Sequence, residues 1–338
     1  MKLAIINDLR NPERWHLPWP EHYAGFLEHC ADLEQLGFDE IVIPEHHFDP
    51  DGYVPNPIPI LSALATKTSR VRLGSDLFVL PNHHPVRLAE DAAMVDILSN
   101  GRLIFKCGAG GRPGEPPALG WDERNRLGRN SEAIAIIKKC WTEDVFDYDG
   151  RYWKLHNVRL VPKPVQQPHP PIMFPAMNPK AMERNAREGY GANMGNPTGS
   201  PDIGYWKDWH GRWDAMLKQY GRTRAECPTS FFFLLFASED PERDWAKHRE
   251  STLHVNHAYA RMGRNPNLLP TPEDMPNWQQ IFQTPEQCVT FLREMFDNGA
   301  VAPDTLVLWD LRPSMSYDES LQFHKRFMEK VWPHVRDW

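Results

Sequence analysis

A carboxylate and two imidazoles stand together where a short apolar run ends. The run at 41–43 leads into Glu45, His46 and His47, and a loop rich in Asp, Gly and Pro follows. Imidazole titrates near neutral pH without tuning, so it suits acid–base chemistry, and it also ligates metals. Neighbouring residues of an extended chain point in opposite directions, so the two histidines do not easily reach one ion. The cluster indicates acid–base chemistry or cofactor contact, with a metal site or a structural pair of histidines as alternatives.

A metal site would need further ligands from other segments. Asp76, His83, His84 and Asp310 are candidates, but no H-x-H or H-E-x-x-H pattern accompanies them. The metal-dependent hydrolase that such a site would make is therefore kept as an alternative, and no residue is assigned as a metal ligand.

A polar pair interrupts the apolar run at 71–80. A strand that is buried on both faces should be continuously apolar, but Ser75 and Asp76 break this one. Buried polar groups need partners. The pair predicts contact with a ligand or, alternatively, a hydrogen-bonded aspartate of the core.

Two further segments suit a flat or anionic ligand. The run KCGAGGRPGE at 106–115 places glycines after a predicted strand, which lets a ligand approach the backbone, although it fits neither a Walker loop nor G-x-G-x-x-G. Asn178 before Pro179 predicts a helix start, where free backbone N–H groups with Lys180 and Arg184 suit a phosphate. An ordinary capped helix with a solvated basic face is the alternative.

The composition argues against several classes of protein. The 338 residues carry a formal net charge of −7, which gives no attraction to nucleic acid or to anionic membranes. No stretch approaches the roughly 18 apolar residues that span a bilayer, and the start lacks the features of a secretory signal. Five scattered cysteines without C-x-x-C spacing argue against disulfides and structural zinc. We expect a cytoplasmic protein without nucleic-acid or membrane partners.

Strands and helices are predicted to alternate along the whole chain. The predicted strands are 3–7, 41–43, 71–80, 103–107, 172–174, 192–194, 229–237 and 305–309. Eight strands, each followed by a helix, favour a single (β/α)8 TIM barrel over 1–338, in which catalysis sits at the carboxyl ends of the strands. The segment 146–160, which turns at Asp149–Gly150, predicts an inserted hairpin.

The same segments resemble the bacterial luciferase-like flavin monooxygenases. The resemblance is carried by EHHF, by RLGSDLFVLPNHHPVRLAEDAAMVDILSNGRL at 72–103, and by WTEDVFDYDGRYWKL and LVPKPVQQPHPPIMF between 141 and 174. It runs in continuous order over 1–194 and is looser after that. It implies a luciferase-like barrel, usually a homodimer, that holds FMN at the carboxyl ends of its strands.

The resemblance also implies roles for individual residues. His46 matches a histidine needed for flavin chemistry, and Asp76 with Leu77 matches a non-proline cis peptide that lies against the isoalloxazine ring. Where luciferases of the family hold the phosphate with an arginine, this chain has Ala109, so other groups must bind the phosphate. The expected cofactor contacts are Glu45, Ser75, Asp76, Leu77, Ala109, Gly110, Met177 and Asn178, with His46 as the catalytic residue.

The activity implied by the resemblance is a two-component monooxygenase. A separate NAD(P)H:flavin reductase would supply reduced FMN, which with O2 oxygenates a small, apolar or aromatic substrate. A variable lid region is expected at 240–284. The side chains that could enclose the substrate, or else belong to the core or an interface, are Trp206, Trp209, Phe232 and Trp278. An oxidoreductase that uses the deazaflavin F420 on the same barrel and a non-catalytic flavin-binding protein are the alternatives.

Overall fold

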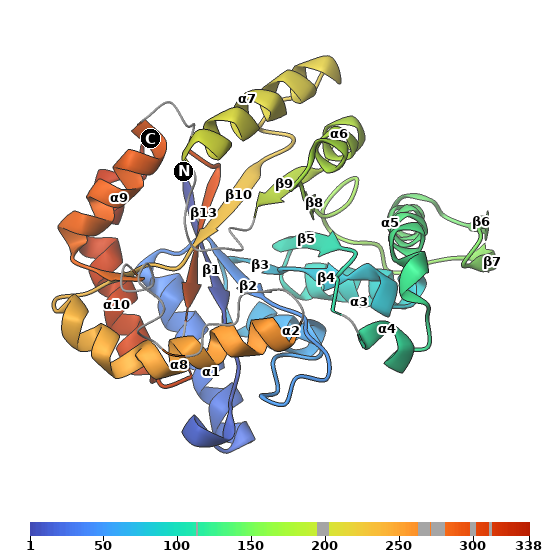
Figure 1. Ribbon diagram of the computed structural model, residues 1–338. Helices are drawn as coiled ribbons and strands as arrows, with labels where there is room; N and C mark the ends of the chain where they lie inside the picture. The colour runs from blue at the N-terminus through green and yellow to red at the C-terminus, as the bar shows by residue number, and fades with distance from the viewer. Residues whose placement is uncertain (113, 195–202, 263–270, 272–280, 298–301, 311–312) are drawn as a thin grey trace.

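Eight parallel strands close into a barrel at the centre of the computed structural model (Figure 1). The structure describes residues 1–112, 114–194, 203–262, 271, 281–297, 302–310 and 313–338. The barrel strands are β1 (Lys2–Asn7), β2 (Glu40–Ile43), β3 (Arg72–Ser75), β5 (Leu103–Gly108), β8 (Ile172–Pro175), β9 (Gly191–Met194), β10 (Thr229–Phe233) and β13 (Thr305–Asp310). Their order is β3-β2-β1-β13-β10-β9-β8-β5, and pairing of β3 with β5 closes the ring. The predicted (β/α)8 barrel is confirmed.

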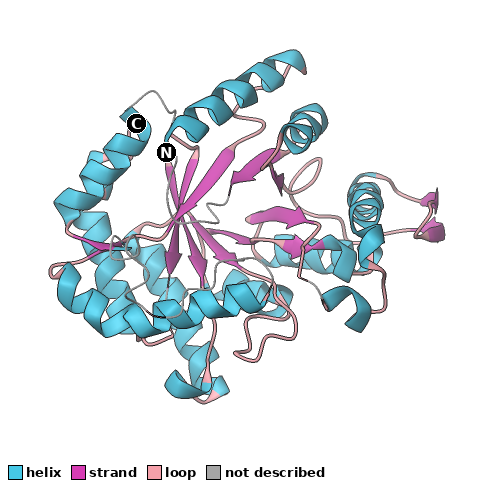
Figure 2. Cartoon of the chain, in the orientation of Figure 1, coloured by secondary structure: helices cyan, strands magenta, loops and turns pink. Residues whose placement is uncertain are grey.

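Helices surround the strands, as Figure 2 shows. The longer ones are α1 (Trp19–Leu36), α2 (Pro57–Lys67), α3 (Pro85–Leu98), α5 (Arg126–Thr142), α6 (Pro179–Glu188), α7 (Ile203–Gln219), α8 (Pro241–Arg261), α9 (Pro285–Asp297) and α10 (Tyr317–Lys330). The predicted cap of α6 is present, because the Asn178 side chain accepts a hydrogen bond from the Ala181 N–H at 3.0 Å. The predicted hairpin is also present as β6 (Phe146–Asp149) and β7 (Lys154–Val158), at the edge of the molecule beyond α5 (Figure 1).

The interior of the barrel has an apolar side and a polar side. Alternate residues of each strand face inward, and several of those on β1, β2 and β13 are apolar. They form a cluster of Ala4, Ile6, Val42 and Val307, against which Phe232 and Trp309 pack.

The polar side comes from β3, β5 and β9 and the strands next to them. The buried Lys106 pairs with Glu40 at 3.0 Å. Asp76 accepts a hydrogen bond from the Asn193 amide, whose oxygen accepts one from the Ser230 hydroxyl at 2.8 Å. A ligand at the mouth of the barrel would therefore meet polar groups on one side and apolar groups on the other.

Two strand predictions are wrong in their extent. The predicted strand 71–80 stops at Ser75, and after the Asp76–Leu77 peptide the short β4 (Phe78–Val79) pairs with β5. The predicted strand 229–237 ends at Phe233, and β11 (Phe236–Ala237) pairs with β12 (Phe282–Gln283) outside the barrel. An apolar run predicts burial, but it does not show where a buried chain leaves the sheet.

Helix α8 occupies the first half of the segment predicted as a lid. Its start carries clear signals, since the Asp240 side chain accepts from the Arg243 N–H at 3.0 Å and Pro241 stands in the first turn. Sequence reasoning did not identify this helix. Most of the second half, 263–270 and 272–280, lies outside the described residues. Of the helices that the structure describes, none combines the length and apolarity of a membrane span.

Candidate active site

His46 lies buried just after β2, at the carboxyl end of the barrel, with 6% of its surface exposed. Its imidazole stacks on the ring of Tyr53, with the ring centres 4.4 Å and the planes 27° apart. The backbone N–H of His46 donates to the Val54 carbonyl at 2.9 Å, which holds the two ends of the loop together. His47 points elsewhere and donates from Nε2 to Glu45 at 3.1 Å. The two histidines therefore diverge, as their adjacency predicted.

Glu45 is the centre of a buried ionic network. Its carboxylate accepts hydrogen bonds from Nε2 of His83 at 2.9 Å, from Nε2 of His47 at 3.1 Å and from the Val79 N–H at 3.2 Å. Burial raises the pKa of Glu45, but the charges and hydrogen bonds of His83 and His47 outweigh burial and lower it. Conversely, Glu45 raises the pKa of His83 against the effect of burial. The network joins the loop after β2 to β4, and direct cofactor contact by Glu45 stays a prediction.

The end of β3 presents a buried hydroxyl. Ser75 is fully buried, and among the described residues its Oγ has no hydrogen-bond partner. The Asp76–Leu77 peptide is cis, as the resemblance implied. Burial, the largest cause, raises the pKa of Asp76 despite the opposing effects of Lys106 and Asn193. Because buried polar groups normally have partners, the Ser75 hydroxyl suits a ligand with polar atoms.

The turn after β5 lies against this segment. A side chain at Gly108 would come within 3.0 Å of the Leu77 side chain, and one at Gly110, where φ is +66°, within 2.5 Å of Val79. Glycine is favoured at Gly110 by its positive φ and by the close approach of Val79, and at Gly108 a side chain would have to displace the end of Leu77. The Arg126 guanidinium at the start of α5 donates to the Gly110 carbonyl at 3.1 Å, which places a cation beside Ala109 and Gly110. Sequence reasoning missed Arg126, because no local pattern links it to the turn.

The residues predicted around the start of α6 are only partly available. Met177 is 40% exposed, and the Asn178 side chain is engaged in capping the helix. Arg184 packs over the Phe174 ring at 4.4 Å and donates to the Asn185 side chain, so it is committed to the packing of α6 on β8. Lys180 and Arg184 are the two cations predicted to suit a phosphate here, and of these Lys180 is exposed and is not used in this packing.

Of the aromatic side chains predicted to enclose the substrate, one lies inside the barrel and another serves helix packing. Phe232 lies inside the barrel with its ring edge-on to Trp309 at 5.7 Å. Trp209 is buried, donates from Nε1 to the Ala176 carbonyl at 2.9 Å and stacks on Trp213, so it serves the packing of α7. The side chains of Trp206 and Trp278 lie outside the described residues.

An aromatic and cationic cluster that sequence reasoning missed lies above His46. Arg10 follows β1, is buried, pairs with Asp8, and has its guanidinium carbon 3.6 Å from the centre of the Tyr53 ring and 4.6 Å from that of Tyr259 on α8. The two tyrosine hydroxyls are 3.0 Å apart. Members of this cluster are up to 249 positions apart, so no local signal connects them.

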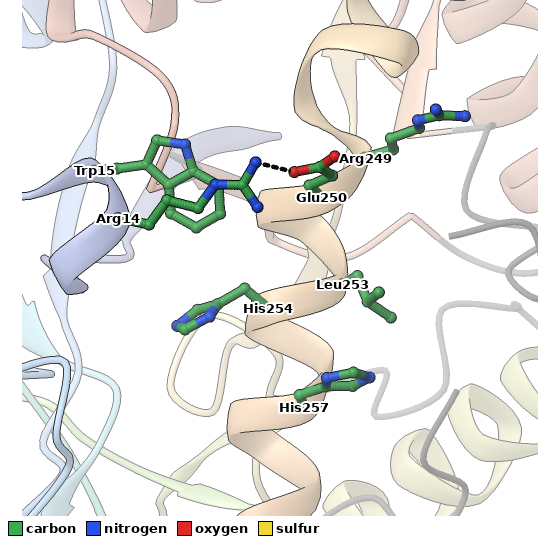
Figure 3. Close-up of a pocket in the computed structure, with 7 residues that line it drawn as sticks. All are labelled: Arg14, Trp15, Arg249, Glu250, Leu253, His254 and His257. Carbon is green, nitrogen blue, oxygen red and sulfur yellow. Dashed lines mark ion pairs between the residues drawn. The ribbon is translucent and has the colours of Figure 1, made fainter. Parts of the chain in front are cut away.

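A separate hollow of about 520 Å³ lies between the segment after β1 and α8 (Figure 3). It is lined by Arg14, Trp15, Arg249, Glu250, Leu253, His254 and His257. His254 reaches the loop after β2 and donates to Asp51 at 2.6 Å. Among the described residues, no group of three or more His, Cys, Asp or Glu side chains is arranged to hold a metal ion.

Comparison with known proteins adds three findings. Residues 5–301 match the model of the luciferase-like monooxygenase family. The oxygenase component of a flavin-dependent trigonelline monooxygenase from Acinetobacter baylyi is 36% identical over 172 residues, or 49% of this chain and 47% of that protein. An F420-dependent glucose-6-phosphate dehydrogenase from Microbacterium testaceum is 29% identical over 204 residues, or 58% of this chain and 59% of that protein.

A solved structure is similar over its whole length. The oxygenating constituent of 3,6-diketocamphane monooxygenase from Pseudomonas putida, a type II Baeyer-Villiger monooxygenase in complex with FMN, superposes with a TM-score of 0.81 at 16% identity. The superposition covers 99% of this chain and 98% of that one. This likeness shows the fold. The chain spans about half the length of the curated relatives that it matches first.

Proposed function

Because the chain belongs to the luciferase-like monooxygenase family, we propose that it is a flavin-dependent monooxygenase that uses reduced FMN and O2 to oxygenate a small organic substrate. The observation that carries the proposal is the buried Ser75 hydroxyl, which has no partner among the described residues and stands at the carboxyl end of the barrel. The glycine-rich turn after β5, which lies against Leu77 and Val79 and carries the Arg126 cation beside Gly110, completes a set of groups that suits a flat, phosphorylated molecule.

In this proposal the ends of β3 and β5 hold the cofactor. Ser75 and Asp76 would hold the cofactor through hydrogen bonds, and Leu77 would supply apolar contact beside them. The backbone around Ala109 and Gly110 would hold the phosphate together with Arg126, which donates to the Gly110 carbonyl and would take the place of the family arginine that this chain lacks at Ala109. The rest of the phosphate site is the first turn of α6, with Met177 and Asn178.

When bound, reduced FMN supplies the electrons that activate O2. His46 would hold a proton at one of its ring nitrogens and donate it to an oxygen atom of the bound reactants, because stacking on Tyr53 orients the imidazole and leaves its nitrogen edge uncovered by that ring. Tyr259 on α8 and the rings of Phe232 and Trp309 restrict the entry of water from above and within the barrel.

The apolar side of the barrel supports an apolar or aromatic substrate. Ile6, Val42, Phe232 and Trp309 present hydrocarbon surface inside the barrel. Tyr259 connects this surface to His46, because its ring centre lies 5.5 Å from that of Trp309 and 6.3 Å from that of His46. Apolar walls with few polar groups are typical of sites for small organic molecules. The substrate would thus lie on the β13–β1–β2 side of the mouth and the cofactor on the other side.

The proposal includes partners. A separate NAD(P)H:flavin reductase supplies reduced FMN to a homodimer of this chain in the cytoplasm. The Acinetobacter relative, which is an oxygenase component, supports a two-component arrangement.

A second candidate is an oxidoreductase that uses the deazaflavin F420 for hydride transfer. The similarity to an F420-dependent dehydrogenase from Microbacterium testaceum supports it. Binding of FMN, riboflavin and F420, each followed by fluorescence, separates the two candidates. Tighter binding of F420 than of FMN would overturn the monooxygenase proposal.

Activity is tested by mixing the protein with reduced FMN and ¹⁸O2 and measuring ¹⁸O in the products of a panel of apolar ketones, aldehydes and phenols. We expect ¹⁸O in at least one product. We expect His46→Asn to slow that reaction by about 100-fold, as is common for the loss of an acid–base group, with FMN affinity nearly unchanged. The matched control is His156→Gln in the exposed hairpin. Full activity of His46→Asn would show that another residue moves the proton.

A further inference from the structure

Tyr53 is held between His46 and Arg10. The guanidinium carbon of Arg10 is 3.6 Å from the ring centre, so the guanidinium covers one face of the tyrosine. The imidazole of His46 is stacked with its centre 4.4 Å from the same ring centre. Two planar groups cannot occupy one face at those distances, so His46 and Arg10 lie on opposite faces and Tyr53 is the middle layer of the stack.

Arg10 is fixed in this place by burial and by charge. Its side chain is fully buried and pairs with the equally buried Asp8. Among the described residues its Nε and Nη2 atoms have no hydrogen-bond acceptor. The guanidinium carbon lies over the rings of Tyr53 and Tyr259, and a buried guanidinium over an aromatic ring is stabilised by cation–π attraction.

Tyr259 connects the stack to helix α8. Its hydroxyl lies 3.0 Å from that of Tyr53, and its ring lies edge-on to His46 at 6.3 Å and to Trp309 at 5.5 Å. The middle layer is therefore held by stacking on both faces and by a hydrogen bond at its hydroxyl. Helix α8 is thereby connected to His46 through Tyr259 and Tyr53.

We propose that Arg10 and Tyr259 are positioning residues for His46, and that the docking of α8 on the barrel orients the imidazole through Tyr53. The inference rests on the role proposed above for His46. In this proposal, α8 orients His46 as well as restricting the entry of water at the mouth of the barrel. Neither residue needs to touch cofactor or substrate in this role.

The first test follows His46 by NMR in the full-length protein, with its imidazole signal assigned by comparison with His46→Asn. In the wild type, we expect the ring current of the stacked Tyr53 to displace the His46 Hε1 resonance. Tyr259→Phe keeps the ring but removes the hydroxyl, and Arg10→Met removes the charge and the planar stack. We expect both substitutions to move the resonance toward the position of an exposed histidine.

A matched control is available on the same two segments. Arg14 follows β1 as Arg10 does, and it pairs with Glu250 on α8 (Figure 3), but both side chains are at least half exposed. Exposed pairs contribute little to stability. Arg14→Met should therefore leave the His46 resonance in its wild-type position.

The second test is a double-mutant cycle. Tyr53→Phe and Tyr259→Phe each remove one partner of the same hydrogen bond, so the double variant should change the rate of ¹⁸O incorporation no more than either single variant. Each single variant should lower kcat by about tenfold with KM for FMN within about twofold, because sub-ångström misplacement of a catalytic group costs rate more than binding. Additive effects would overturn the proposal.

The outcomes separate this proposal from the proposed function. An unchanged His46 resonance in both Tyr259→Phe and folded Arg10→Met overturns the positioning role. If Arg10→Met does not fold, Tyr259→Phe decides alone. A displaced resonance combined with full activity of His46→Asn leaves the positioning role standing and removes the catalytic role of His46.

Discussion

The Glu45 carboxylate accepts a hydrogen bond from Nε2 of His83 at 2.9 Å, with the Glu45 side chain fully buried and that of His83 22% exposed. The pair ties the loop that carries His46 to the segment that follows the Asp76–Leu77 peptide. The Glu45–His83 ion pair therefore fixes the position of His46, proposed for acid–base chemistry, relative to Asp76 and Leu77, proposed for cofactor contact.

Glu45→Gln should destabilise the fold most between about pH 4.3 and pH 6.5, the ordinary pKa values of glutamate and histidine. Burial raises the pKa of Glu45, but His83 and His47 outweigh burial, so the pKa is lower in the folded than in the unfolded protein. Glu45 therefore stabilises the fold at pH values above its pKa in the unfolded protein, and this stabilisation is lost as the pH falls through its pKa in the folded protein. The pKa of His83 is higher in the folded than in the unfolded protein. His83 therefore stabilises the fold at pH values below its pKa in the unfolded protein, and this stabilisation is lost as the pH rises through its pKa in the folded protein.

The measurement is urea unfolding at pH 4, 5.5 and 8. We expect a loss of about 2 kcal/mol at pH 5.5, less than is usual for breaking a fully buried pair because His83 can release its proton to solvent. Glu143→Gln, which removes an exposed pair with Lys139, is the control and should change stability by less than about 0.5 kcal/mol. An equal loss at all three pH values would contradict the charged pair.

Arg126→Met should weaken FMN binding by about 10-fold to 100-fold, the cost of one charged hydrogen bond to a phosphate. Riboflavin has no phosphate, so its affinity should stay unchanged. Arg124→Met is the matched control, because Arg124 lies two residues away with its side chain 89% exposed and paired with Asp122. Fluorescence titration with both ligands measures the ratio of the two affinities. Equal weakening of riboflavin and FMN would show that Arg126 only supports the turn.

Gly110→Ala should weaken the binding of both FMN and riboflavin. The residue has φ of +66°, and an added Cβ would lie 2.5 Å from the Val79 side chain, so the turn after β5 must move. We expect a loss of about 1–3 kcal/mol in the free energy of unfolding, the usual cost of backbone strain of this kind. Gly114→Ala has a similar positive φ but open space around its Cβ, so it separates the backbone cost from the clash. If the two variants bind alike, the approach of Gly110 to Val79 has no role in the site.

The sequence predicts the barrel because its main signals are local. Apolar runs such as 41–43 and 305–309 are followed by helical periodicity, and the Asn178 cap is read from two adjacent residues. The end of β3 was not predictable in the same way, because Ser75 and Asp76 mark a polar interruption without showing that the chain leaves the sheet there.

The site is predicted less completely, because its parts meet only in three dimensions. Glu45 is predicted beside the cofactor from its place after β2, but its hydrogen bond with His83, which lies 38 positions later, could not be predicted from either segment alone. Arg126 and Tyr259 carry no motif at all. Their positions depend on how α5 and α8 pack on the barrel, which no short stretch of sequence specifies.

Asp310→Asn should destabilise the protein more than any of the substitutions above. Asp310 ends β13, is fully buried and accepts hydrogen bonds from Nε2 of His29 on α1 and of His324 on α10, both at 2.7 Å, and from the Ser320 hydroxyl. An asparagine of the same shape lacks the charge and turns an N–H group toward one of these donors. We expect a loss of about 3–5 kcal/mol at pH 7, as for a broken buried ion pair.

The same substitution has a signature in pH. Burial opposes ionisation of Asp310, but His324 and His29 outweigh it and hold its pKa well below the ordinary value. Its contribution is therefore present above about pH 4, the unfolded pKa of aspartate, and is lost as pH falls further toward the folded one. Urea unfolding should show that the difference in free energy of unfolding between wild type and Asp310→Asn becomes smaller below pH 4. Asp91→Asn, which removes an exposed contact of 3.6 Å with Arg87, is the control and should have the same free energy of unfolding as the wild type at every pH. A difference that persists undiminished in acid would mean that packing, and not the buried charge, joins α1 and α10 to the end of β13.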